Sequence, residues 1–194
     1  MNVLIAGVGG QGTLLASRIL GKLAEARGSD CKLNEVHGMA QRGGSVVTHV
    51  KIAEKVYSPV IAEGDADFIL AFEMLEALRY CGYLKKDGII IVNTQKIMPM
   101  PVITGAAAYP DGILGALKSK YNVVAADALS AAVEAGNVKA VNTVILGCFA
   151  GAAGIPYDEM ERALSLSVKP KLLEVNKAAL EKGYALVGRR PGTE

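Results

Sequence analysis

The pattern of apolar and polar positions predicts buried strands that alternate with helices. Residues 2–6 form a continuous apolar run, as in a strand that a parallel sheet buries on both faces. From Thr13 the apolar positions recur at helical spacing, and Gly28 is a plausible stop. Residues 31–36 predict a second strand. These three elements together predict a βαβ opening.

The middle of the chain departs from this alternation. Residues 45–52 alternate along a strand period, and a second extended stretch, residues 55–61, follows after a short turn. We interpret the two as a β-hairpin added antiparallel at the edge of the main sheet. The preceding segment, HGMAQRGG at residues 37–44, is polar and rich in glycine, so it predicts a loop.

Regular alternation returns after residue 66. Residues 95–112 contain three prolines and predict a loop with little regular structure. The remaining predicted strands are 67–72, 88–92 and 122–126, and the remaining predicted helices are 73–80, 127–135, 142–153, 157–166 and 170–182. The whole pattern predicts a single unit over residues 1–194 with an α/β, Rossmann-like three-layer fold: a mainly parallel sheet, a β-hairpin insertion and C-terminal helices.

Composition narrows the class of protein. A net charge of +2 is too small to predict nucleic acid or membrane partners. Cys31, Cys81 and Cys148 are scattered and form no CxxC pair, so we expect neither an iron–sulfur cluster nor a metal held by this chain alone. A strand at the very start leaves no room for a signal peptide, and no apolar run approaches the ~18 residues of a membrane span. We therefore expect a cytoplasmic protein.

A glycine-rich turn follows the first strand. Gly7, Gly9 and Gly12 satisfy GxGxxG, with Gly10 and Gln11 between them, and the motif opens a helix. Its glycines permit a tight turn, an approach of backbone to a phosphate, and close packing of helix on strand. The helix start also favours an anion.

Three interpretations of that turn stay open: a dinucleotide site, a site for another anion or a partner, and a purely structural turn. Glu35 lies near the end of the second strand, where an acid that binds ribose would lie. It is alternatively a surface acid.

The loop HGMAQRGG carries the second group of candidate residues. Arg42 precedes Gly43 and Gly44, so its guanidinium would emerge from an uncrowded backbone and could bind a carboxylate or phosphate. His37 and Gln41 are its polar neighbours. The alternative is a solvated loop with an exposed arginine.

Two further residues have both a functional and a structural interpretation. Glu73 follows a predicted strand at the sheet edge where α/β proteins place ligands, so it could orient a substrate or a neighbouring loop. It is alternatively a first-turn acid that complements the dipole of its own helix. His49 falls on the polar face of the predicted hairpin, where we expect a partner contact or solvation rather than proton transfer.

Three stretches carry a resemblance to a known family. GVGGQGTLLASRIL at residues 7–20, EVHGMAQRGGSVVTHVKI at 35–52 and ADFILAFEMLEALRY at 66–80 resemble the gamma-type subunit or domain of the 2-oxoacid:ferredoxin oxidoreductases. The HGMAQRGG loop is similar to that of the small beta subunit of the indolepyruvate branch, whereas the pyruvate and 2-oxoglutarate branches tend to have a YGxExRGG type of loop. Residues 127–147 also resemble the later part of that small subunit.

The resemblance implies an enzyme that works only as a complex. Such complexes oxidatively decarboxylate a 2-oxo acid, here an aryl-2-oxo acid such as indolepyruvate, pass electrons to ferredoxin and transfer the acyl group to coenzyme A. Thiamine diphosphate, Mg²⁺ and [4Fe–4S] clusters would lie mainly on a large alpha subunit. This chain lacks the GDG…NN signature of thiamine diphosphate and magnesium, since EGDADF at residues 63–68 has Ala66 at the second glycine.

On this interpretation the chain has a structural and substrate-side role, and we assign it no catalytic residue. The glycine turn and Arg42 would form anion-binding surfaces, for coenzyme A phosphates or for the active-site region of the partner. Apolar surface left by a missing partner is compatible with a homodimer of the isolated chain. The competing interpretations are a freestanding NAD(P)-dependent oxidoreductase, for which no Ser–Tyr–Lys set is evident, and a non-catalytic nucleotide-binding regulator.

Overall fold

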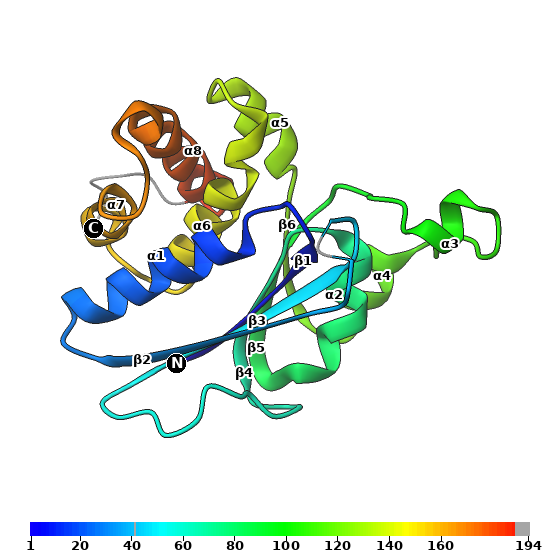
Figure 1. Ribbon diagram of the computed structural model, residues 1–194, viewed down its shortest axis with the longest axis horizontal. Helices are drawn as coiled ribbons and strands as arrows, with labels where there is room; N and C mark the ends of the chain where they lie inside the picture. The colour runs from blue at the N-terminus through cyan, green and yellow to red at the C-terminus, as the bar shows by residue number, and fades with distance from the viewer. Residues whose placement is uncertain (41, 189–194) are drawn as a thin grey trace.

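One six-stranded sheet runs through the computed structural model, which describes residues 1–40 and 42–188 (Figure 1). β1 pairs parallel with β4, β4 with β5, and β5 with β6, whereas β3 is antiparallel to both of its neighbours. Across the sheet the order is β2 (Asp30–His37), β3 (Ser45–Ala53), β1 (Asn2–Val8), β4 (Ala66–Ala71), β5 (Leu84–Asn93) and β6 (Asn122–Ala126).

Helices cover the two faces of the sheet unequally (Figure 1). Alternate residues of the central strands point to opposite faces, and this separates the apolar core into two clusters. The larger cluster lies beneath α1 (Thr13–Ala26), α5 (Ala128–Glu134), α6 (Val141–Ala152), α7 (Tyr157–Ser165) and α8 (Leu173–Leu186). The smaller lies beneath α2 (Met74–Tyr80) and α4 (Ile113–Lys118). This arrangement confirms the predicted α/β fold class with its mainly parallel sheet.

The predicted edge hairpin is wrong. β3 does not pair with residues 55–61; it inserts between β2 and β1. Residues 55–61 form no strand. Their apolar side chains, Val56 and Ile61, are buried, and their backbone N–H groups donate to Asp30 Oδ2 and His49 Nδ1. Residues 55–61 are therefore an extended segment that packs on the sheet through Val56 and Ile61 and does not pair in a ladder.

Because β3 is inserted in the sheet, the predicted βαβ opening is correct in its connection and wrong in its strand pairing. β1 and β2 run parallel, because both are antiparallel to β3, and α1 connects them as predicted. They are not neighbours, however, since β3 lies between them. Residues 35–37 at the end of β2 are thus one strand farther from the glycine turn than in a sheet where the two strands pair.

Most other predicted elements agree with the structure within a few residues. β6 has the predicted bounds, and Asp127 caps α5 by accepting a hydrogen bond from Ser130 N at 3.0 Å. α4 was not predicted, and β5 begins earlier than expected, at Leu84. The predicted helix at 170–182 begins with a 3₁₀ turn, Pro170–Leu172, and continues as α8, which ends at Leu186. Residues 95–112 lack regular structure except for α3 (Met100–Ile103).

The glycines of α6 allow the close helix packing that the sequence predicts. A Cβ added at Gly147 would lie 2.3 Å from Leu180 O, and one added at Gly183 of α8 would lie 2.1 Å from Val144 O. The two helix backbones therefore touch, and no side chain fits between them. Among the described residues, no helix has the length and apolar character required to cross a bilayer.

Candidate functional site at the carboxyl edge of the sheet

The two glycine-rich segments that the sequence singled out form one surface. We call residues 7–12 the glycine turn and residues 37–44 the RGG loop. β3 runs antiparallel to β1, so Ser45 pairs with Val8 and the two segments meet at the carboxyl edge of β1. Gly9 N donates to Gly44 O at 2.8 Å, and Gly43 N donates to Gly9 O at 3.3 Å. These hydrogen bonds hold the RGG loop against the glycine turn.

The glycines of the turn differ in what a side chain at each position would meet. A Cβ at Gly7 would lie 3.1 Å from the Oε1 of Gln11, so Gly7 allows close packing. Gly12 has φ +85°, and a Cβ there would lie 2.6 Å from Asn142 Nδ2. Gly10 has φ +104° and open space around it. The backbone at Gly10 is therefore accessible to a ligand, while Gly12 is required by the fold itself and Gly7 is closely packed.

Gln11 serves the fold of the turn. Its Oε1 accepts a hydrogen bond from Val8 N at 2.7 Å, and its Nε2 donates to Phe72 O at 2.9 Å. The amide thus connects the ends of β1 and β4. Both of its polar ends are engaged within the protein, so its predicted contact with a cofactor would require these bonds to rearrange.

Glu35 brings a negative charge to the start of α1. Its Oε2 accepts hydrogen bonds from Thr13 Oγ1 at 3.1 Å and Thr48 Oγ1 at 3.0 Å. The adjoining cavity of about 410 Å³ is lined by Gly9, Gly10, Gly12, Thr13, Leu14, Glu35, His37 and Val46. A carboxylate beside the first turn of α1 repels a second anion. This geometry argues against a dinucleotide pyrophosphate on this side of the turn.

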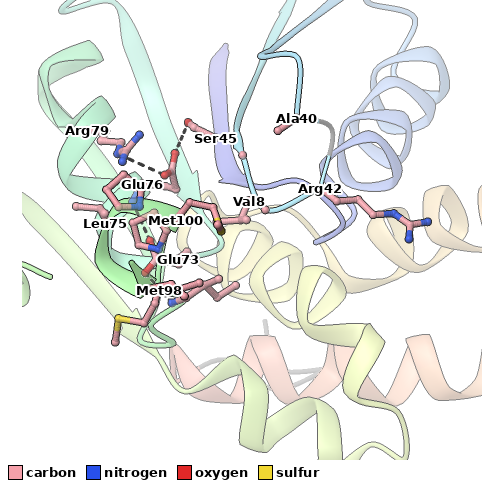
Figure 2. Close-up of a pocket in the computed structure, with 16 residues that line it drawn as sticks. Val8, Ala40, Arg42, Ser45, Glu73, Leu75, Glu76, Arg79, Met98 and Met100 are labelled. Atoms are coloured by element: carbon pink, nitrogen blue, oxygen red, sulfur yellow. Dashed lines mark hydrogen bonds and ion pairs between the residues drawn. The ribbon is translucent and has the colours of Figure 1, made fainter. Parts of the chain in front are cut away.

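The RGG loop presents exposed polar side chains. His37 is exposed, with its Nδ1 3.0 Å from Gly38 O. Arg42 is exposed, and its guanidinium points away from Glu73 and Glu76 (Figure 2). Gln41 lies outside the described residues. Arg42 is therefore accessible for the anion contact that the sequence predicts, but on the side of the loop that faces away from α2.

A second cavity, of about 430 Å³, lies between the RGG loop and the first turn of α2 (Figure 2). Glu73, which is 1% exposed, is the N-cap residue of α2 and accepts a hydrogen bond from Glu76 N at 3.1 Å. Its Oε1 accepts hydrogen bonds from Ile97 N at 3.1 Å and Tyr109 Oη at 2.5 Å. Burial, together with this carboxylate, raises the pKa of Tyr109. Glu73 is thus the N-cap residue of its helix, one position before the first turn that the sequence predicts for it, and it also holds a neighbouring loop.

Glu76 was not identified from the sequence. It is 4% exposed, accepts a hydrogen bond from Ser45 Oγ at 2.5 Å and forms an ion pair with Arg79 Nε at 3.5 Å (Figure 2). Burial raises its pKa, while the Ser45 bond and Arg79 oppose that rise. The available signal was the spacing Glu73-x-x-Glu76, which places one acid at the N-cap and a second acid in the first turn of the same helix.

Asn93, also missed, connects three elements beneath the site. It is fully buried at the end of β5. Its Nδ2 donates to Phe72 O at 3.1 Å, and its Oδ1 accepts from Ala128 N at 3.3 Å. Gln11 and Asn93 therefore share the carbonyl of Phe72, and together they fix the ends of β1, β4 and β5 relative to α5.

The expected exposure of His49 is wrong. It is 6% exposed, its Nδ1 accepts from Ile61 N at 3.1 Å, and burial lowers its pKa. The reason is the misassigned hairpin: residues 55–61 pack over this face of β3. Its ring also meets Tyr83 edge to face.

The described residues do not fit a metal or an iron–sulfur cluster. In residues 1–40 and 42–188, no group of three or more His, Cys, Asp or Glu side chains could hold a metal ion. Cys31, Cys81 and Cys148 are free thiols, and burial raises the pKa of Cys148 to about 12.

Comparison with known proteins decides the family. The sequence profile described as pyruvate ferredoxin/flavodoxin oxidoreductase matches residues 2–186. The chain belongs to this family. The resemblance noted in the glycine turn, the RGG loop and β4–α2 is thereby confirmed.

Curated relatives and a solved structure agree with this assignment. The "Indolepyruvate oxidoreductase subunit IorB" of Thermococcus kodakarensis is 42% identical over 188 residues, which cover 94% of this chain and 93% of the relative. The protein of the same name from Archaeoglobus fulgidus is 42% identical, with 97% of each chain covered. The keto/oxoacid ferredoxin oxidoreductase gamma subunit of Geobacter sulfurreducens is 22% identical, with a TM-score of 0.72 and 96% and 97% of the two chains covered. At that identity, the last likeness supports the fold.

Proposed function

We propose that this chain is the small subunit of an indolepyruvate-type 2-oxoacid:ferredoxin oxidoreductase and is not active alone. The complex would convert aryl-2-oxo acids to aryl-acetyl-CoA and carbon dioxide while it reduces ferredoxin. The observation that carries this proposal is the 42% identity, over nearly the whole of both chains, to proteins named as indolepyruvate oxidoreductase subunits. The HGMAQRGG loop at residues 37–44 supports the aryl branch.

The cofactors are assigned mainly to the large subunit. Thiamine diphosphate with Mg²⁺ supplies the decarboxylation chemistry in such a complex, and [4Fe–4S] clusters carry electrons to ferredoxin. The scattered cysteines of this chain, one of them in the core, are consistent with clusters held elsewhere. We place the complex in the cytoplasm.

The proposed contribution of this chain is an anion-binding surface at the carboxyl edge. Gly10 offers accessible backbone, and Arg42 offers an exposed guanidinium on the adjoining RGG loop. The guanidinium of Arg42 points away from Glu73 and Glu76, so an anion would contact it on the side of the RGG loop that faces away from α2 (Figure 2). The anion is a phosphate of coenzyme A or an acidic group near the active site of the partner.

Co-expression with the large subunit tests the proposal. We expect the two chains to co-purify, and viologen reduction with indolepyruvate, thiamine diphosphate and coenzyme A to require both. If this chain does not bind the large subunit, and if titration of NAD(H) with the isolated chain changes the nucleotide fluorescence, the proposal is contradicted. That result would favour a dinucleotide-binding protein.

The role of Arg42 needs a matched control. Arg42→Ala should raise the KM for coenzyme A or weaken assembly of the complex, because it removes the exposed cation of the RGG loop. Arg18→Ala, at an exposed position on the outer face of α1, removes the same charge away from the site and should change neither. If Arg42→Ala leaves assembly and every kinetic constant of the complex unchanged, the assigned role is wrong.

A further inference from the structure

A segment without charged residues extends from the carboxyl edge. Residues 97–110, IMPMPVITGAAAYP, lie between Lys96 and Asp111, and we call them the apolar arm. Figure 1 shows the arm, with α3 near its tip, projecting away from the sheet and from the helices that cover it. Its large apolar side chains are open to solvent: Met98 is 43% exposed, Met100 64% and Ile103 65%. An exposed apolar surface of this kind is typical of an interface.

The base of the arm is fixed by one buried carboxylate. Glu73 Oε1 accepts hydrogen bonds from Ile97 N at one end of the arm and from Tyr109 Oη at the other. The ammonium of Lys96 lies 5.4 Å from the centroid of the Tyr109 ring. Hydrogen bonds to a buried charged group are stronger than neutral ones, so the two ends are held together and the arm has a defined exit.

The tip of the arm is ordered by its own contacts. Ile103 N donates to Pro99 O at 3.1 Å, and Thr104 N donates to Met100 O at 2.9 Å; Gly105, with φ +76°, ends the turn. Within the described parts of the chain, every hydrogen bond of residues 98–108 stays inside the arm. The arm is therefore shaped in advance but supported only at its base, which lowers the entropy cost of binding to another surface.

The arm is continuous with the RGG loop. Both line the cavity of about 430 Å³: Met98, Pro99 and Met100 contribute one wall, and Arg42 and Gly44 contribute the other. The RGG loop, to which the proposed function assigns a contact with the partner, therefore adjoins the arm across this cavity, while the guanidinium of Arg42 points to the other side of the loop.

We propose that the apolar arm is the element that docks this chain into an apolar groove of the large subunit. This inference rests on the proposed function. The exposed charges nearby are three basic side chains, Arg42, Arg79 and Lys96, against one acidic side chain, Asp111, whereas Glu73 and Glu76 are buried. The groove should therefore have an acidic rim. A second copy of this chain fits less well, because a two-fold contact at the arm would bring these basic side chains together.

The test measures binding of the purified large subunit to immobilised full-length variants of this chain. The double variant Met100→Asp/Ile103→Asp should weaken binding roughly tenfold or more, because it would place two carboxylates in an apolar groove. Met100→Ala/Ile103→Ala should weaken it in the same direction by a smaller factor. The control Val133→Asp/Leu166→Asp changes two comparably exposed apolar residues on α5 and beside α7 and should bind like the wild type.

The possible results distinguish the docking role of the arm from the proposed function of the chain. Wild-type binding that only the arm variants weaken supports the inference. Wild-type binding that the arm variants leave unchanged overturns the docking role and leaves the subunit assignment intact. Sedimentation that shows a homodimer broken by the arm variants, with unchanged affinity for the large subunit, assigns the arm to a second copy instead. Absence of wild-type binding overturns the proposed function and this inference with it.

Discussion

The α6–α8 pair and the glycine turn both depend on glycine, but for opposite reasons. At Gly147 and Gly183 a side chain has no room, because a Cβ would lie 2.3 Å and 2.1 Å from backbone oxygens of the facing helix. At Gly10 a side chain has room, with nothing within 4 Å, but the φ of +104° disfavours one. The first region buries its glycines to stabilise the fold. The second leaves accessible backbone at the edge of the sheet, as a binding surface requires.

The largest expected effect is in the helix pair. Gly183→Ala should lower the free energy of unfolding by about 3 kcal/mol, since backbone must move to admit the methyl group. Urea unfolding followed by circular dichroism measures this. Gly115→Ala in α4, with open space around it, should be neutral or stabilise the protein by up to about 1 kcal/mol. Equal effects at the two positions would contradict the close packing of α6 on α8.

The next effect concerns the base of the apolar arm. Glu73→Ala should cost about 2–3 kcal/mol, because it removes the cap of α2 and leaves the Ile97 amide and the Tyr109 hydroxyl without their acceptor. Tyr109→Phe removes one of the three bonds and should cost about 1 kcal/mol. Faster hydrogen exchange at Ile97 N in Glu73→Ala, but little change there in Gly115→Ala, would assign the loss to the arm. Unchanged exchange at Ile97 would show that other contacts hold the arm.

A smaller effect on stability is expected at the glycine turn. Gly10→Ala should cost about 1–2 kcal/mol through backbone conformation alone. Gly38→Ala, in the RGG loop with an ordinary φ and open space, should change stability little. In the assembled complex Gly10→Ala should lower activity more than its stability loss explains. If the two variants have the same activity in the complex, the accessible backbone at Gly10 is not used.

The smallest expected effect is a pH dependence of the free energy of unfolding, which variants at the two histidines test. Burial lowers the pKa of His49, so the folded protein binds a proton less readily than the unfolded chain does. The free energy of unfolding should therefore fall as the pH drops below the ordinary histidine pKa of 6.5. In His49→Asn, whose amide oxygen can still accept from Ile61 N, this fall should be shallower. His37→Asn changes the other, exposed histidine and serves as the matched comparison, and thermal unfolding from pH 5 to 7.5 compares the three proteins.

Local signals determined much of the fold and part of the site. The strand periods at residues 2–6, 67–72 and 122–126, the helix of α1 and the cap at Asp127 depend on near neighbours in sequence, so they could be predicted. The glycine turn and the RGG loop were likewise identified from their own residues, and their resemblance to one family was confirmed.

Only the tertiary structure decided which elements meet. The alternation of β3 is the same whether the strand pairs at an edge or inserts between β2 and β1, and no local pattern distinguishes the two. The same holds for the polar groups at and beneath the site, because Ser45, Glu76 and Asn93 come from three separate elements. Propensity and periodicity act over a few residues, whereas strand order and the pairing of buried polar groups are set by packing between residues far apart in the chain.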